Sequence, residues 1–442
     1  MKRALALVAF LLGWLVLGAV PASAHVEIVS SAPGDGARLS AAPSLVSVTL
    51  SENVGIQPGS IKVVDLAGKQ VDAGPVFQPG DVAEQLAVRL KPGVPDGSYL
   101  VEYAFVSADS HPVRGTFAFV VGTGPLVTSA GAVSASTGTD TAVDVVSTAA
   151  RWLAYLGVVL LGGLAFVVLC RPAARTDPRA RRLLNWGAGL VAATAVAAFV
   201  LQGPYATGRN LEAVFDTGLL ADTLRVAYGK LLLLRLAAVA VLALLLPRLL
   251  RPELPERLRA RYENLAMVTG FVVLLTFSAT GHPVADPIMF ISVSADLVHF
   301  GAVAIWVGGL TQLALCLHRP VPDEDPAPAA ARFSRLAAGA VTAIALSGVV
   351  LALRIMPSLT TLWTTTFGLL VLLKIAGLAV LLAVASRSRR AVREGMRKQD
   401  EGTTKTATTQ LRRLRQTVAV EVLLGAVVLA LAAFLTVTPP SG

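Results

Sequence analysis

Three residues in the first part of the chain have the types and spacing of a metal site. Asp109 and His111 form a D-x-H element within VSADSHPVRGTF (106–117), and His25 directly follows the tripeptide ASA (22–24). Cleavage after ASA would give His25 a free α-amino group, which titrates near pH ~8 and can chelate a metal ion together with the ring of the same residue. With the ring of His111 and the carboxylate of Asp109, the donors form a nitrogen-rich tetragonal set that favours Cu(II). A D-x-H element by itself is more typical of a surface loop, so the hypothesis depends on His25.

The beginning of the chain has the parts of a signal peptide. Lys2 and Arg3 precede an apolar run over residues 4–20, and the ASA tripeptide is well placed for a peptidase. We therefore expect residues 1–24 to be a cleaved signal peptide and the following residues to be exported. The alternative is an uncleaved anchor helix.

The residues that must position this metal site have a β-strand pattern. Over 25–122, short alternating runs such as LVSVTL and SYLVEYAFV are separated by turns rich in Pro, Gly and Asp. Several short strands at such spacing predict a small antiparallel sandwich. The D-x-H element then lies in the tight connection between the last two strands, where Pro112 limits the flexibility of the backbone. Residues 123–147 are small and polar without periodicity, which predicts a flexible linker.

The remaining residues are too apolar for a soluble domain. Of the 442 residues, 54% are hydrophobic and 15% are charged, which indicates that most of the chain lies in a lipid bilayer. An α-helix needs about 20 apolar residues to cross a hydrocarbon core of roughly 30 Å. Segments of that kind predict an all-α polytopic membrane domain of about eight transmembrane helices over 148–442: 148–170, 183–203, 227–247, 263–281, 288–317, 336–353, 367–385 and 416–436.

The formal net charge of +10 follows from the topology of these helices. An exported sandwich fixes the first helix as running from outside to inside, and the connections after the first, third and seventh helices are rich in arginine (171–182, 248–261 and 387–415). Cytoplasmic connections carry such an excess of basic residues. We therefore predict a multi-pass protein of the bacterial plasma membrane with an extracytoplasmic N-terminal domain and no nucleic-acid partner.

Two pairs of helical segments are similar to each other. LGGLAFVVLC (161–170) is similar to VGGLTQLALC (307–316), and YGKLLLLR (228–235) is similar to FGLLVLLK (367–374). Both cysteines of the chain end the first pair, and they predict no disulfide framework. The near-equal offsets favour a duplication of four helices in the same orientation, a repeat type found among transporters. Chance similarity between segments rich in Leu and Gly is the alternative.

Ionisable residues within the predicted helices mark a candidate path for an ion. His299 lies roughly 16 Å along the fifth helix if that helix begins near residue 288, and Asp296 shares its helical face. His282 and Met289 lie near the outer end, where Met289 offers sulfur to Cu(I), although isolated methionines are more often packing residues. Ionisable groups inside a membrane are costly and usually face a pathway or a partner. The alternative is that both histidines form hydrogen bonds between helices.

Other charged residues in the predicted helices are interpreted as structural. Lys230 and Arg235 snorkel or pair with acids such as Glu421, and Lys374 is placed in the same class. The chain contains no Walker-type phosphate-binding sequence, so we expect that ATP does not drive it directly.

Several of these segments resemble a known family. HVEIVSSAPGDGARL (25–39) and SADSHPVRGTFAFVVG (107–122) are similar to CopC, a family of exported copper-binding proteins, and the helical part resembles CopD. The one-chain arrangement resembles CopC–CopD fusions associated with copper uptake or resistance. The resemblance implies an Ig-like sandwich and implies that His25, Asp109 and His111 are its Cu(II) ligands.

The CopD resemblance rests on two elements. One is a G-H-x element that contains His282, and the other is an H-x(6)-W-x-G-G-L helix that contains His299, Trp306, Gly308 and Gly309. Some CopC proteins also have a methionine-rich Cu(I) site. Because no methionine lies between the mature N-terminus and the first helix, soft thioether ligands are missing there and only Cu(II) is expected in the sandwich.

These features predict a copper-handling membrane protein that is not an enzyme. Its exported domain binds Cu(II), and its membrane domain imports copper through His282, Asp296, His299 and Met289. The alternative is a membrane-anchored protein that sequesters copper for resistance without transport. A third class is an oxidoreductase, with oxygen chemistry at the histidine chelate or with a b-type haem held by His282 and His299. Copper ions and the lipid bilayer are the expected partners.

Overall fold

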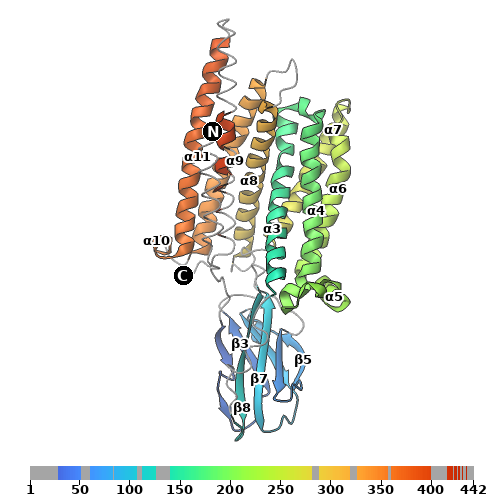
Figure 1. Ribbon diagram of the computed structural model, residues 1–442, viewed down its shortest axis with the longest axis vertical. Helices are drawn as coiled ribbons and strands as arrows, with labels where there is room; N and C mark the ends of the chain where they lie inside the picture. The colour runs from blue at the N-terminus through green and yellow to red at the C-terminus, as the bar shows by residue number, and fades with distance from the viewer. Residues whose placement is uncertain are drawn as a thin grey trace.

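The computed structural model describes two parts of the chain, a β-sandwich and a helical half (Figure 1). This arrangement confirms the predicted fold class. The described residues are 28–50, 60–82, 84–106, 112–125, 140–280, 288–318, 326–356, 360–399 and part of 416–435.

The sandwich consists of two four-stranded sheets. One sheet has the order β1 (Ile28–Ala32), β3 (Leu45–Leu50), β6 (Gln85–Leu90) and β5 (Asp72–Phe77); the other has the order β2 (Arg38–Leu39), β8 (Pro112–Val121), β7 (Gly97–Val106) and β4 (Ile61–Asp65). Neighbouring strands are antiparallel, except for the short parallel pair of β2 and β8. Side chains of both sheets form one apolar core in which Phe105 and Phe119 are among the largest fully buried members, whereas the edge strands β1 and β2 contain no buried residue.

The helical half contains seven long helices in the described part of the chain. They are α3 (Thr141–Gly162), α4 (Pro178–Thr207), α6 (Ala227–Leu249), α7 (Glu256–Ser278), α8 (Met289–His318), α9 (Ala327–Ile355) and α11 (Thr366–Gln399). A π-helical turn over Phe166–Cys170 continues α3, and the short helices α5 (Thr217–Arg225) and α10 (Thr361–Thr364) precede α6 and α11.

Six helical segments are long and apolar enough to cross a membrane, and they match six of the eight predicted spans. The predicted span 263–281 overlaps α7, whose first turns are polar, and the described residues of 416–436 are helical. The total of eight spans therefore stays a prediction.

The first helix begins earlier than the sequence pattern suggested. α3 starts at Thr141 rather than near 148, so the end of the predicted linker 123–147 is helical. The cause is local: the side chain of Asp140 accepts a hydrogen bond from the backbone N–H of Ala142 at 2.8 Å, and Asp144 lies in the first turn. An aspartate at the N-cap and another in the first turn both stabilise a helix start.

The predicted internal repeat has matching close contacts in the two halves of the bundle. α3 and α8 cross at equivalent glycines: a Cβ at Gly162 would lie 2.1 Å from the carbonyl oxygen of Ala304, and a Cβ at Gly308 would lie 2.1 Å from that of Val159. Real Cβ atoms do not come within 3.0 Å of another heavy atom. Small residues let membrane helices approach to backbone contact in this way.

The second pair of similar segments also occupies matching places. Val226 and Thr365 have extended backbones, and each joins a short outer helix to the long helix that follows. Cβ atoms at Gly229 and Gly368 would lie 1.8 Å and 2.1 Å from a carbonyl oxygen of that short helix. The matching contacts at both pairs support duplication over chance similarity.

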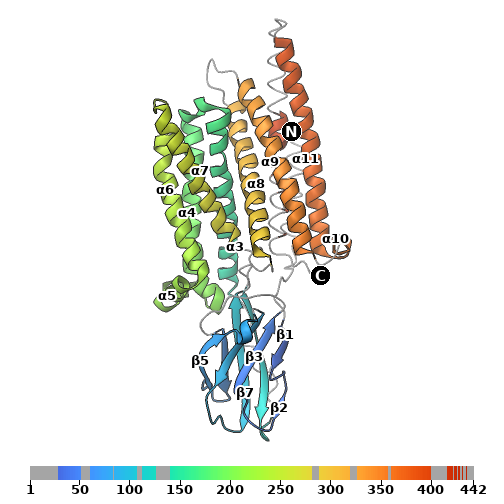
Figure 2. The same ribbon diagram turned by 180° about the vertical axis from the view of Figure 1, so that it is seen from behind.

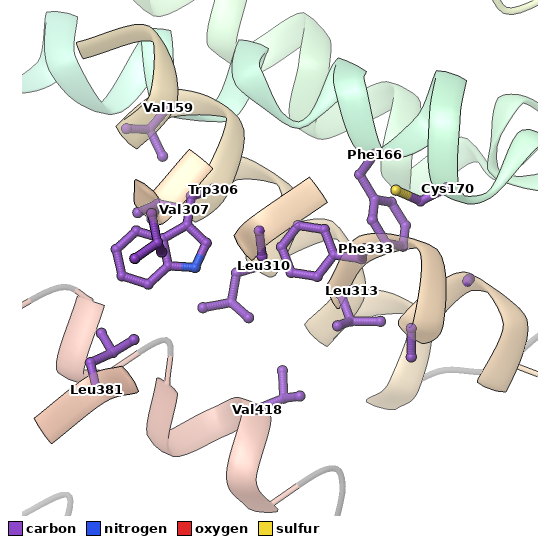
Figure 3. Packing of buried hydrophobic residues seen from close by; sticks show 14 of the residues in the cluster. Val159, Phe166, Cys170, Trp306, Val307, Leu310, Leu313, Phe333, Leu381 and Val418 are labelled. Atoms are coloured by element: carbon purple, nitrogen blue, oxygen red, sulfur yellow. The ribbon is translucent and has the colours of Figure 1, made fainter. Parts of the chain in front are cut away.

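The apolar core of the second half is built around Trp306 (Figure 3). This side chain is only 6% exposed, and Phe166 and Phe333 pack edge to face nearby with ring centroids 5.6 Å apart. Gly309 gives Phe333 its space, since a Cβ there would lie 2.4 Å from the ring. The Trp and Gly residues of the CopD-like element therefore pack α3, α8 and α9 together.

Candidate functional site

The predicted ligands of the sandwich lie outside the described residues. His25 precedes β1, Asp109 and His111 stand between β7 and β8, and His282 stands between α7 and α8. Among the residues that the structure describes, no group of three or more His, Cys, Asp or Glu side chains could hold a metal ion. The strands and helices on either side of the predicted ligands are described, and their ends define the surroundings of the candidate site.

β1 begins and the β7–β8 hairpin turns at the same end of the sandwich. The short connection 91–96 joins the end of β6 to the start of β7, so these two strand ends are adjacent. β3 is antiparallel to β6 and therefore ends at the opposite end of the sandwich, level with Val106 of β7. Since Ile28 pairs with Leu50 at the end of β3, β1 starts there too. The segments that carry the predicted ligands are thus attached to one end of the sandwich.

That end of the sandwich faces the helical half. β7 contacts α4, and two opposite views show the end of β7 directed towards the helices (Figures 1 and 2). α3 and α8 both begin on this side of the bundle. The end of the sandwich to which the ligand-bearing segments are attached is therefore directed towards the side of the bundle where α3 and α8 begin.

The hairpin is tightly packed just before its turn. Tyr103 stacks on Phe105 with ring centroids 5.5 Å apart, and its hydroxyl lies over Gly115, where a Cβ would be 2.0 Å from that oxygen. Burial raises the pKa of Tyr103, and the charge of Asp35 raises it further. Tyr103 therefore packs β7 against β8 just before the turn.

In the helical half, His299 of α8 contacts α9. Its Nδ1 lies 3.1 Å from the hydroxyl oxygen of Ser347, and the ring rests against Gly348, where a Cβ would lie 3.4 Å from Cε1. Ser347 is buried and His299 is half-buried. A hydrogen bond between helices, the structural alternative for this histidine, is thus present. It occupies one of the two ring nitrogens, and Nε2 is the other.

Two charged residues accompany His299. Asp296 precedes it by one helical turn on α8, and Lys374 of α11 lies within electrostatic range of both side chains. All three residues are half-buried. Met289, in contrast, is the first residue of α8, is 50% exposed and lies about 15 Å along the helix from His299. The structure places Asp296 one turn from His299 and leaves Met289 at the start of α8.

The first half has a buried cation of its own. Arg235, which is 5% exposed, donates from Nε to the hydroxyl of Thr276 at 3.0 Å and from Nη2 to the carbonyl of Thr276 at 2.9 Å. Its guanidinium also lies 3.5 Å from the ring centroid of Phe277. The suggested pairing with Glu421 is wrong for Arg235: within the described part of the chain it forms no ion pair, and it binds the last turn of α7, where carbonyl groups lack helical partners.

Three family models match successive parts of the chain. Residues 28–122 match the CopC domain, residues 142–287 the N-terminal domain of copper resistance protein D-like proteins, and residues 327–435 copper resistance protein D. The chain is 32% identical over 120 residues to copper resistance protein C of Escherichia coli, covering 26% of this chain and 94% of that protein. The chain belongs to the CopC–CopD family.

Members of this copper transport and resistance family include a relative that matches both parts. The CopC–CopD chain is 29% identical over 370 residues to the copper transport protein CutJ of Bacillus subtilis, covering 82% of this chain; it spans 66% of the length of CutJ. The crystal structure of CopC from Methylosinus trichosporium OB3b shares 28% identity over 22% of this chain and 93% of that chain, with a TM-score of 0.20. With its six apolar helices and CopD domain, the chain is a multi-pass membrane protein.

One contact of the helical half that sequence reasoning missed is the one between His299 and Ser347. Serine is common in apolar helices, and these two residues are 48 positions apart. One signal was present in the sequence: Ser347-Gly348 is a polar and small pair within the otherwise apolar run 343–353 of α9. That pair predicts a close contact, but it does not identify the partner.

Proposed function

We propose that this CopC–CopD protein captures copper outside the cell and passes it inward. Removal of residues 1–24 exposes His25, and the CopC domain (25–122) binds Cu(II) through His25, Asp109 and His111. The segment 123–140 joins it to the CopD domain, which begins with α3 at Thr141 and imports copper across the plasma membrane.

The position of the CopC domain carries this proposal. The end of the sandwich to which the ligand-bearing segments are attached is directed towards the side of the bundle where α8 begins. His299 and Asp296 lie on that same helix, about 15 Å and 10 Å from its first residue. Copper released by the sandwich meets His282 and Met289 first and the His299 cluster second, without crossing the bundle.

The donor types fit this sequence of steps. Amine, imidazole and carboxylate donors suit Cu(II), and the sandwich has no methionine to hold Cu(I). The helical part offers imidazole, carboxylate and a thioether, which are fewer and more widely spaced. Imidazole and carboxylate are donor types that the sandwich and the helical part share, so the same ion can be held at both stages.

Copper accumulation in a copper-starved strain tests the proposal. Cells that express the intact chain should accumulate copper, and the His299→Ala variant should not, while its Cu(II) binding stays intact. His318→Ala is the matched control, because His318 is an exposed residue at the other end of α8 whose Nδ1 lies 2.9 Å from the carbonyl of Ala314. Membrane levels of each variant are compared. Normal accumulation by His299→Ala at equal protein level would leave a membrane-anchored sequestering protein, and a Soret band in the purified chain would indicate haem.

The Cu(II) site has a separate test. One extra residue before His25 in the purified mature chain turns the amine into an amide and removes the chelate, so Cu(II) affinity should fall by orders of magnitude. His111→Ala should cost less, because the chelate remains. Electron paramagnetic resonance follows both variants. Equal affinity of the extended and mature chains would contradict the assignment of His25.

A further inference from the structure

We infer that Ser347 is a positioning residue that holds His299 in the tautomer with a free Nε2, so that this nitrogen can bind the passing copper ion. The inference rests on the proposed function of His299. It is carried by the direction of two hydrogen bonds at the contact between α8 and α9.

The hydroxyl of Ser347 has a single hydrogen and two kinds of hydrogen-bonding neighbour, the carbonyl oxygens of its own helix and the ring of His299. Its oxygen lies 2.5 Å from the carbonyl oxygen of Ala343 and 3.3 Å from that of Ile344, one turn earlier in α9. Carbonyl oxygens only accept hydrogen bonds, so the hydroxyl donates to the helix, and the 2.5 Å contact identifies Ala343 as the acceptor. The hydrogen of Ser347 is then no longer available to His299.

The remaining contact, at 3.1 Å, must therefore receive its hydrogen from His299. The lone pair of Ser347 accepts, and Nδ1 of His299 donates. A neutral imidazole has one N–H and one bare nitrogen, so the hydrogen on Nδ1 leaves the lone pair on Nε2. Metal-binding histidines typically have this arrangement, in which a partner at one ring nitrogen fixes the tautomer and orientation of the other.

The packing of α9 fixes the ring as well as its tautomer. Gly348 follows Ser347, and its Cα surface supports the imidazole face without a side chain between them. Asp296 and Lys374 are the charged groups near the ring, from α8 and α11. Ser347 contacts the ring at Nδ1, and the backbone carbonyl of Ile344 in the same part of α9 is a second acceptor for the ring, while the charges act on the ion that approaches it.

Nitrogen-15 spectra of the full-length, histidine-labelled protein without copper report the tautomer directly. His299 signals are assigned by their loss in His299→Ala. The wild type should carry its hydrogen on Nδ1, and Ser347→Ala should give a mixture of tautomers with copper accumulation about tenfold lower. Ser347→Thr keeps a hydroxyl that can still bond the i−4 carbonyl, so it should restore both the spectrum and accumulation. Gly339→Ala is the packing control, because it lies on the same helix and nothing lies within 4 Å of a Cβ there.

Two results would overturn the inference while leaving the pathway intact. One is a wild-type spectrum with the hydrogen on Nε2, and the other is full accumulation by Ser347→Ala under conditions where His299→Ala fails. Normal accumulation by His299→Ala overturns the pathway itself and, with it, the role of Ser347 in copper passage. Thermal unfolding of each variant in detergent separates loss of fold from loss of orientation.

Discussion

The two halves of the CopD domain share a backbone plan and differ in polar residues. The alignment of the Gly-Gly pairs places Ala150 and Leu153 of α3 opposite Asp296 and His299 of α8. In the first half, Arg235 is bound to the end of α7. Its counterpart Lys374 instead lies near Asp296 and His299. We therefore predict that the first half serves as a scaffold and that the second half contains the proposed copper path.

The carboxylate of the second half gives the strongest test of this division. Asp296→Ala should reduce copper accumulation at least about tenfold, because it removes the only anionic donor one turn from His299 among the described residues. Leu153→Ala in the equivalent turn of α3 should leave accumulation within twofold. Uptake assays at equal membrane level measure both. An equal loss in the two variants would mean that both halves carry copper.

Gly162 and Gly308 should contribute equally to the stability of the crossing between α3 and α8. Gly162→Ala and Gly308→Ala each place a methyl group against a backbone carbonyl, and each should cost about 1–3 kcal/mol of stability. Gly189→Ala is the control, since nothing lies within 4 Å of a Cβ there. Thermal unfolding in detergent gives the comparison. If only one of the two substitutions lowers the stability, the two glycines do not have equivalent roles.

The buried cation of the first half should affect stability without affecting transport. Arg235→Met removes the two hydrogen bonds to Thr276 and should destabilise the protein by about 1–3 kcal/mol. Copper accumulation per folded molecule should remain unchanged. Detergent unfolding and uptake are measured on the same preparations. Loss of uptake at normal stability would place Arg235 in the pathway.

The cation of the second half should behave in the opposite way. Lys374→Met removes a positive charge near the proposed path, so the apparent KM for copper should fall severalfold with little change in unfolding temperature. Lys374→Arg keeps the charge and should resemble the wild type. Initial uptake rates over a range of copper concentrations provide the measurement, and an unchanged KM would return Lys374 to a structural role.

The sequence predicted the parts of this molecule that local patterns determine. Alternation identified the sandwich, apolar length identified the membrane spans, and the rarity of ionisable residues in those spans drew attention to Asp296 and His299. The predicted boundary was less accurate where one polar side chain determines the start of a helix. Asp140 starts α3 within a segment that has no hydrophobic periodicity, so the sequence pattern placed the start of this helix too late.

Contacts between distant helices were the part that sequence could not supply. Arg235 pairs with Thr276 at a separation of 41 residues, and Ser347 pairs with His299 at 48. Thr276 and Ser347 have uncharged hydroxyl side chains, so their residue types do not predict a pairing with Arg235 or His299. Such contacts depend on how helices pack, and the order of residues along one helix does not contain that information.

The glycine crossing also bears on how the chain diverged. The repeat can be traced to one four-helix ancestor that paired with a second copy about a two-fold axis. In such a dimer both copies have the same sequence, so one substitution at the glycine crossing changed both sides of the interface. Fusion of the two copies into one gene removed this constraint, since each half then mutates alone. The shared backbone contacts at Gly162 and Gly308 could persist while one copy gained a histidine and a carboxylate and the other kept aliphatic side chains.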